Sequence, residues 1–238
     1  MFTSEYDIRR GEKIMNVAES KLPASKPVPK TTGNTIRWAH HYDKVVRLMT
    51  LGKDKAIREI TAEMGHIKLG DTVLEVGCGT GELTIAAKVR AGFAGKVFGI
   101  DAVPEMIEVA RSKVAELGVE IDFQVDLIEA LSFADDTFDV VLSSLMMHHL
   151  PDDVKLKGLS EIHRVLKPGG RLLVVDVQHP TTLLGRVLMA LFLRPKIESG
   201  VDDLPTMMTR VGFTHIEAAD ASFLSMLGFV WGEVNTSV

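Results

Sequence analysis

Val73-Leu-Glu-Val-Gly-Cys-Gly-Thr-Gly81 is the stretch that decides the fold of this chain. A short apolar run interrupted by the acid Glu75 leads into glycines at alternate positions, and an apolar helical pattern begins at Leu83. This order predicts a strand, a tight glycine loop and a helix. Glycine reaches positive φ and lets a ligand lie against the main chain. The N-terminus of the following helix directs free N–H groups and partial positive charge at that ligand.

The spacing of the glycines narrows the class of ligand. A dinucleotide-binding loop reads G-x-G-x-x-G and a P-loop ends in Lys-Ser/Thr, whereas this loop reads G-x-G-x-G and lacks that ending. The pattern therefore favours a ligand without a phosphate chain.

Composition and charge argue against several classes of protein. The net charge is −5 and there is no long basic run, which disfavours nucleic acid as the main partner. The single cysteine, Cys78, excludes an intramolecular disulfide and a cysteine-based metal cluster, and we interpret it as a small residue that fills the loop. The histidines lack the helical i, i+4 spacing with an acid that marks zinc, so no metal site is expected. The N-terminus does not resemble a signal peptide and no apolar run approaches the ~18 residues of a membrane helix, so we expect a cytoplasmic protein.

The chain divides into an arm and one large domain. Residues 1–35 are expected to form an N-terminal arm or linker, because Lys21–Lys30 holds three prolines and three lysines. Residues 36–238 are expected to form the domain, which begins with a helical pattern from Ile36 and a second helix at Asp54–Met64.

Strands and helices alternate between residues 71 and 178. Strands are predicted at Thr72–Val76, Lys96–Asp101, Ile121–Val125, Phe138–Ser143 and Arg171–Val177, with helices at Glu82–Arg90, Pro104–Leu117 and Asp152–Leu166. Short Val/Ile/Leu-rich strands joined by helices predict a parallel sheet, with ligands at the carboxyl ends of the strands. A last helix at Asp202–Val211 precedes strands at Thr214–Ala219 and Phe223–Trp231, which we expect to pair as a hairpin.

Five motifs in this order resemble those of the class I S-adenosylmethionine-dependent methyltransferases, over about residues 36–234. They are Val73–Gly81, Val97–Met106, Phe123–Leu127, Phe138–Ser144 followed by Leu145–Leu150, and Leu166–Asp176. The resemblance implies an α/β, Rossmann-like, seven-stranded and mostly parallel sheet with helices on both faces and a C-terminal antiparallel hairpin. It also implies S-adenosylmethionine as the cofactor, which leaves as S-adenosylhomocysteine.

The resemblance also assigns cofactor contacts. Asp101 would accept hydrogen bonds from both ribose hydroxyls, Met106 would pack on the adenine, and Asp126 would accept from the adenine amino group. The Leu127 N–H would face the ring, and Ser143 would end the fourth strand beneath the cofactor. The full set of predicted cofactor-binding residues is Glu75, Gly77, Cys78, Gly79, Gly81, Asp101, Ala102, Met106, Asp126, Leu127 and Ser143.

Catalytic candidates come from residues that titrate or stack. Tyr42 is predicted to close over the methyl donor, because an aromatic ring can stack on a sulfonium cation. Histidine titrates near neutral pH, so a general base is sought among the loop histidines. Base candidates are His41, His148, His149 and His179. Tyr42, His148 and His179 are the residues predicted to act in catalysis.

Both ends of the domain are similar to the ubiquinone/menaquinone-biosynthesis C-methyltransferases. The similarity rests on His41-Tyr-Asp43, Leu51-Gly-Lys-Asp54 and Leu204–Phe213. The chain departs from that family at residues 180–200, where the apolar Thr181–Leu193 replaces the usual segment and is predicted to cover the substrate.

These features predict methyl transfer to a small, largely hydrophobic or aromatic acceptor, quinone-like, at carbon or oxygen. A peripheral membrane contact through residues 181–193 is part of this prediction. Two alternatives stay open at this point: N-methylation of a lipid head group or another small amine, and a non-catalytic S-adenosylmethionine-binding protein. A nucleic-acid methyltransferase is disfavoured, because the fourth strand is not followed by an Asn/Asp-Pro-Pro-aromatic motif.

Overall fold

The fold is taken from a computed structural model, which describes residue 33 and residues 42–43, 46–48, 52–178, 201–220 and 227–236. Most of the predicted arm at 1–35, His179 and the apolar Thr181–Leu193 lie outside these residues. The described strands are β1 (Thr72–Val76), β2 (Lys96–Asp101), β3 (Asp122–Val125), β4 (Phe138–Ser144), β5 (Leu166–Val177), β6 (Thr214–Asp220) and β7 (Leu227–Glu233). The described helices are α2 (Asp54–Met64), α3 (Glu82–Ala91), α4 (Pro104–Leu117), α5 (Asp152–Val165) and α7 (Leu204–Val211), with short 3-10 helices η1 (Met147–His149) and η2 (Val201–Asp203).

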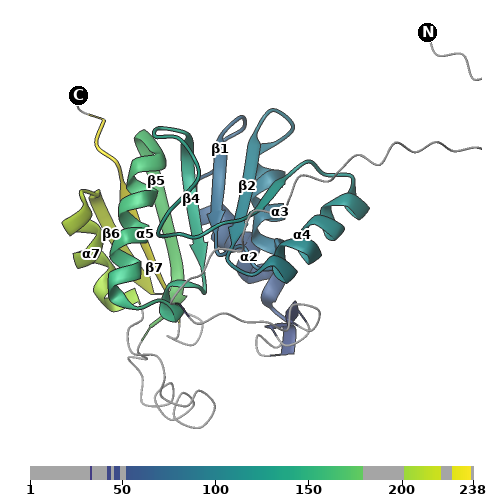
Figure 1. The fold of residues 1–238 in the computed structure, drawn as a ribbon, viewed down its shortest axis with the longest axis horizontal. Helices are drawn as coiled ribbons and strands as arrows, with labels where there is room; N and C mark the ends of the chain where they lie inside the picture. Colours follow the sequence, from purple (N-terminus) through teal and green to yellow (C-terminus); the bar gives the residue numbers. More distant parts are fainter. Residues whose placement is uncertain are drawn as a thin grey trace, which may run out of the picture.

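The strands form one seven-stranded sheet in the order β3-β2-β1-β4-β5-β7-β6 (Figure 1). The first five strands pair in parallel, and β7 runs antiparallel to both β5 and β6. The predicted fold class and the C-terminal hairpin are therefore confirmed. The strand order reverses between β1 and β4, so the carboxyl ends of these two strands meet at the position where open α/β sheets bind ligands.

Two apolar layers cover the sheet. Alternate side chains of the parallel strands pack against α5 and α7 on one face, and the intervening side chains pack against α2 and α3 on the other. Figure 1 shows how these helices lie around the sheet. Helix α4 packs at the β3 side of the sheet, where Phe123 contacts Ile107 and Ala110. Within the described part of the chain, no helix is long and apolar enough to span a membrane.

The main difference from the predicted elements is the start of β5. The strand begins at Leu166, where Arg171 was predicted, and Leu166 pairs with Phe138 across a register shift. That pairing joins residues far apart in sequence, so no local sequence pattern predicts that the strand begins at Leu166. The helix before it consequently ends at Val165. The helix predicted from Asp202 begins as η2 and becomes α-helical at Leu204. Strand β7 spans Leu227–Glu233, and the start predicted for it at Phe223 lies outside the described residues.

Candidate active site

The glycine loop leaves β1 and leads into α3 with its backbone exposed to a ligand. Gly77 and Gly81 have φ angles of 69° and 81°, in the left-handed region that side chains disfavour. A Cβ atom at Gly77 would lie 2.4 Å from Cγ of Met146, and one at Gly81 would lie 2.7 Å from Cζ of Phe123. Both positions therefore require glycine for conformation and for space. Cys78 is buried, and burial raises the pKa of its thiol, which agrees with its interpretation as a small filler.

Asp101, at the end of β2, lies beside the glycine loop, and we call the loop Gly77–Gly81 and Asp101 together the cofactor seat. Its Oδ2 atom accepts the Gly79 N–H at 2.9 Å and its Oδ1 atom accepts the Val103 N–H at 2.9 Å. Burial raises the pKa of the carboxyl group, and the two backbone hydrogen bonds oppose that rise. Each oxygen of a carboxylate has two acceptor positions, so one position on each oxygen remains for a ligand hydroxyl. This arrangement fits a ribose diol.

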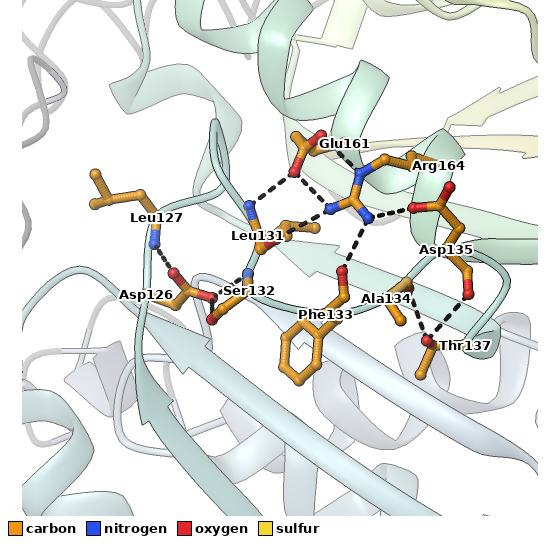
Figure 2. Close-up of polar contacts among 10 residues, drawn as sticks. All are labelled: Asp126, Leu127, Leu131, Ser132, Phe133, Ala134, Asp135, Thr137, Glu161 and Arg164. Carbon is orange, nitrogen blue, oxygen red and sulfur yellow. Dashed lines mark hydrogen bonds and ion pairs between the residues drawn. The ribbon is translucent and has the colours of Figure 1, made fainter.

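The segment after β3 forms the next wall. Asp126 accepts the Leu127 N–H at 2.9 Å through Oδ1, and it accepts both the Ser132 N–H at 2.9 Å and the Ser132 hydroxyl at 2.6 Å through Oδ2 (Figure 2). The Leu127 N–H is thus directed at Asp126. One acceptor position on Oδ1 remains, which an exocyclic amino group can use.

Arg164 on α5 ties that segment to the rest of the domain. Its guanidinium donates to the carbonyls of Leu131 at 3.0 Å and Phe133 at 2.9 Å, and it pairs with Glu161 at 2.7 Å and Asp135 at 2.7 Å (Figure 2). The hydrogen bonds from Arg164 lower the pKa of Glu161, and Glu161 in turn accepts the Leu131 N–H. The loop that carries Ser132, and through it Asp126, is therefore held by the paired side chains of Arg164 and Glu161.

These residues border one pocket at the carboxyl ends of the parallel strands. Eight predicted site residues line it: Tyr42, Gly77, Gly79, Asp101, Ala102, Met106, Asp126 and Leu127. His149, one of the base candidates from the sequence, also lines it. The other lining residues, which the sequence did not single out for the site, are Gly33, Ile100, Val103, Ile128, Glu129, Ser144, Leu145, Met146 and Leu150. Ile100 and Val103 flank the end of β2, and Ser144, Leu145 and Met146 lie at the end of β4. The rule that ligands bind at strand ends is the signal that points to them.

Five predicted residues do not line the pocket: Glu75, Cys78, Gly81, Ser143 and His148. Ser144 takes the place expected of Ser143, because side chains alternate along β4. Ser143 is fully buried, and its hydroxyl has no hydrogen-bond partner in the described part of the chain. Gly81 and Cys78 shape the loop from behind. The predicted catalytic residue His179 is outside the described residues.

Glu75 lies beneath the loop as a buried acid. It accepts a hydrogen bond from the Thr84 hydroxyl, and burial raises the pKa of its carboxyl group to about 8. It is therefore mainly protonated at pH 7 and provides little negative charge. The positive charge of Arg58 on α2 acts on both Glu75 and Tyr42, and the buried Nε of Arg58 has no hydrogen-bond partner among the described residues. Arg58 is not among the residues that line the pocket, and no sequence motif singled it out.

Tyr42 lies over the glycine loop, next to Gly79. Its Cε1 atom lies 3.8 Å from the position that a Cβ atom would take on Gly79, and the side chain packs against Val103 and Met106. Burial raises the pKa of the phenol, so its hydroxyl is neutral at pH 7 and can donate.

The two adjacent histidines have different surroundings. His148 directs Nδ1 at Oδ1 of Asp176, 2.5 Å away, and its backbone N–H donates to Oδ2 of Asp176 at 3.0 Å. His149 lines the pocket, and its ring centroid lies 3.9 Å from that of His148. Burial and the neighbouring His148 lower the pKa of His149, so its imidazole is neutral at pH 7. The sequence favoured His148 for catalysis, whereas the structure turns His148 toward Asp176 and brings His149 to the pocket.

The residues present suit S-adenosylmethionine. The glycine loop has no room for side chains at Gly77 and Gly81, and Asp101 keeps acceptor positions for a diol. In the described residues, no group of His, Cys, Asp and Glu side chains could hold a metal ion.

Comparison with known proteins agrees with this geometry. Residues 73–170 match a family model described as a methyltransferase domain. The chain is 32% identical to the ubiquinone/menaquinone biosynthesis C-methyltransferase UbiE of Hydrogenovibrio crunogenus, over 72% of this chain and 68% of the relative. It is also 32% identical to the demethylmenaquinone methyltransferase of Lactobacillus johnsonii, over 68% and 67%.

Solved structures show the same fold. A SAM dependent methyltransferase from Aquifex aeolicus superposes with a TM-score of 0.66 at 22% identity, covering 81% of this chain and 97% of that one. The ordered motifs, the seat for a sulfonium nucleoside and the sequence relatives lead to one conclusion: this chain belongs to the class I S-adenosylmethionine-dependent methyltransferases.

Proposed function

We propose that this methyltransferase acts on a small, largely hydrophobic or aromatic acceptor, such as a quinone-like ring methylated at carbon or oxygen. One observation carries the proposal: beyond the cofactor seat, the pocket wall after β4 consists of Leu145, Met146 and Leu150 with a single neutral imidazole, that of His149. An apolar wall with one base suits a ring that binds by burial and loses one proton. The relatives from Hydrogenovibrio and Lactobacillus, a ubiquinone/menaquinone biosynthesis C-methyltransferase and a demethylmenaquinone methyltransferase, support it.

The cofactor contacts follow from the same geometry. In our proposal Asp101 holds the ribose, Met106 and Asp126 hold the adenine, and the loop at Gly77–Gly81 holds the methionine end, with Arg58 opposite its carboxylate. When bound, S-adenosylmethionine supplies a methyl group on a sulfonium sulfur with a good leaving group. The protein's main task is then alignment and exclusion of water, which can be worth ~7–11 kcal/mol in favourable cases.

We assign the catalytic roles to three residues. Tyr42 covers the donor with its ring and directs a neutral hydroxyl into the pocket. His149 accepts the proton that the acceptor loses. His148 fixes the turn that carries His149, through its two hydrogen bonds to Asp176. His179, which follows β5, remains a second candidate to line the acceptor side.

The test is transfer of a labelled methyl group from S-adenosylmethionine to a panel of acceptors. The panel contains demethylated quinols, simple phenols, lipid head-group amines and soluble amines, and Asp101→Ala serves as the inactive control. We expect incorporation into quinols or phenols, retained in the organic phase after extraction. Incorporation only into amines would replace the proposal by N-methylation, and cofactor binding without turnover on any acceptor would favour a non-catalytic role.

The apolar Thr181–Leu193 is proposed to cover the acceptor and to provide any membrane contact. Replacing Leu184, Leu188 and Leu191 together with Gln is expected to raise the KM for the acceptor while the Kd for S-adenosylmethionine stays unchanged. Equal loss of both affinities would show that the segment belongs to the core, and an unchanged KM would separate it from the acceptor.

A further inference from the structure

Asp43 joins the segment that carries Tyr42 to two other parts of the cofactor site. Its Oδ1 atom accepts the hydroxyl of Thr80, inside the glycine loop, at 2.6 Å. Its Oδ2 atom accepts from Nζ of Lys113, on α4, at 2.6 Å. Both oxygens of this one carboxylate are therefore engaged by different elements. We name Asp43, Thr80 and Lys113 the Asp43 latch.

Lys113 extends the connection to the start of α3. Its Nζ atom also lies 2.5 Å from Oε1 of Glu82, in the first turn of that helix. The ammonium group thus bridges two carboxylates, one from the N-terminal segment and one from the helix behind the glycine loop. These contacts depend on the tertiary fold, because Asp43 and Lys113 are 70 residues apart in the sequence and Asp43 and Thr80 are 37 apart.

The ion pairs of Lys113 are too exposed to contribute much to the stability of the fold. The side chain of Asp43 is 39% exposed and that of Glu82 is 40% exposed, and ion pairs at such positions contribute little to folding. Thr80, by contrast, is 2% exposed, and its hydroxyl points out of the loop at Asp43. The hydrogen bond therefore fixes the N-terminal segment relative to the loop more than it stabilises the fold.

The Asp43 latch restrains the position of Tyr42. Tyr42 and Asp43 are adjacent in one helical turn, so fixing the Asp43 carboxylate also fixes the direction of the Tyr42 ring. That ring lies over Gly79 and packs on Val103 and Met106, at the border of the pocket. Helix α4 contributes both Met106 beneath the ring and Lys113 to the latch, so the same helix supports both residues of the turn.

We propose that Asp43 is a positioning residue, which holds Tyr42 closed over bound S-adenosylmethionine through Thr80 and Lys113. This inference rests on the proposed role of Tyr42 as the cover of the donor. Thr80 belongs to the glycine loop that would bind the methionine end of the cofactor. Its hydrogen bond to Asp43 therefore holds Tyr42 and that loop together. Release of the cofactor product then requires both hydrogen bonds of Asp43 to break.

The test measures cofactor binding without any acceptor, so it does not depend on the identity of the acceptor. In Asp43→Asn we expect the dissociation rate of S-adenosylmethionine to rise about tenfold to a hundredfold, since charge-assisted hydrogen bonds are lost. Glu82→Gln is the matched control, because it removes the other carboxylate on Lys113 and leaves the Asp43 carboxylate in place; its rate should stay within about twofold of the wild type. Thr80→Val should act like Asp43→Asn, and Thr80→Ser, which keeps the hydroxyl, should restore the wild-type rate.

A double-mutant cycle separates positioning from a purely structural role. If Asp43 acts through Tyr42, the effects of Asp43→Asn and Tyr42→Ala on the dissociation rate will not add, and the double variant will resemble Tyr42→Ala. Additive effects, or a lowered melting temperature with unchanged cofactor kinetics in Asp43→Asn, would overturn the proposal. An unchanged rate in Tyr42→Ala would overturn it as well, by removing the cover on which it rests, while the acceptor panel would still report on turnover.

Discussion

The half-buried His148 and the buried Asp176 form a hydrogen-bonded pair, with Nδ1 of the imidazole 2.5 Å from Oδ1 of the carboxylate. Asp176 is fully buried near the end of β5, and it also accepts the backbone N–H groups of His148 and Val177. A buried carboxylate is tolerated only with such partners. The pair joins η1 to the end of β5, and as a result the next residue along the chain, His149, faces the pocket.

The influence of His148 on His149 predicts the position of the acid limb in the pH–rate profile. Because burial and His148 lower the pKa of His149, the wild-type enzyme should keep its base neutral, and kcat/KM constant, down to a pH below the ordinary value of 6.5. In His148→Gln one lowering influence is gone, so the limb should move to higher pH. His149→Gln should reduce kcat about 100-fold or more, and His163→Gln, on the far part of α5, should leave the profile unchanged. A limb that stays in place in His148→Gln would contradict this coupling.

Glu75 predicts an unusual dependence of stability on pH. The folded-state pKa is raised to about 8, above the ordinary value of 4.5, so between these pH values the folded protein keeps a proton that the unfolded chain has lost. The free energy of unfolding should therefore fall as pH rises, by up to ~1.4 kcal/mol per pH unit in this range. Glu75→Gln should remove that decline. Urea unfolding at several pH values measures the slope, with the surface variant Glu63→Gln as the control; a slope equal in Glu75→Gln and wild type would refute the argument.

Arg164 should affect both stability and cofactor binding. Arg164→Met leaves the carbonyls of Leu131 and Phe133 without their donor, and we expect the free energy of unfolding to fall by about 1–3 kcal/mol. The loop that carries Ser132 should loosen, which raises the KM for S-adenosylmethionine more than it lowers kcat. Arg90→Met is a matched control of similar exposure, because Arg90 makes a 3.4 Å surface pair with Glu63, worth at most ~1 kcal/mol, and a long 3.5 Å hydrogen bond to the Glu59 carbonyl. Equal effects of the two variants would be evidence against the anchoring role.

Asp101 offers the sharpest test of the cofactor seat. Asp101→Asn keeps the size of the side chain, but its amide group would oppose one of the N–H donors at Gly79 and Val103. We expect the affinity for S-adenosylmethionine to fall about 100-fold or more, measured by calorimetry. Asp122→Asn, an exposed position at the start of β3, should bind normally. Unchanged binding in Asp101→Asn would be incompatible with its contact to the ribose.

Arg58 tests the carboxylate end of the cofactor. Arg58→Met should weaken S-adenosylmethionine about tenfold to a hundredfold, since a charge-assisted hydrogen bond is lost. It should weaken decarboxylated S-adenosylmethionine, which lacks the carboxylate, much less. Lys55→Met removes an exposed charge from the same helix and should not change either affinity. Equal weakening of both cofactors in Arg58→Met would place the guanidinium away from the carboxylate.

Local chemistry made much of the fold predictable. Helix α4 begins at Pro104, where proline fits the first turn, and ends at Leu117, followed by Gly118, whose φ of 64° suits glycine at a C-cap. The bounds of β1, β2 and α2 were equally well marked by glycines and by changes of hydrophobic period. The start of β5 was not, because its first pair, Phe138 with Leu166, depends on a strand elsewhere in the chain.

The cofactor seat was predictable for the same reason, and the acceptor side was not. The sequence by itself determined the glycine loop, the acid at the end of β2 and the order of the motifs, because these depend on backbone conformation and on neighbours along the chain. Only the tertiary structure decided that His149 rather than His148 borders the pocket, that the charge of Arg58 acts on Glu75, and that Asp43 reaches both Thr80 and Lys113. Such choices depend on where distant elements pack, since the direction of a side chain is set by contacts that no local pattern encodes.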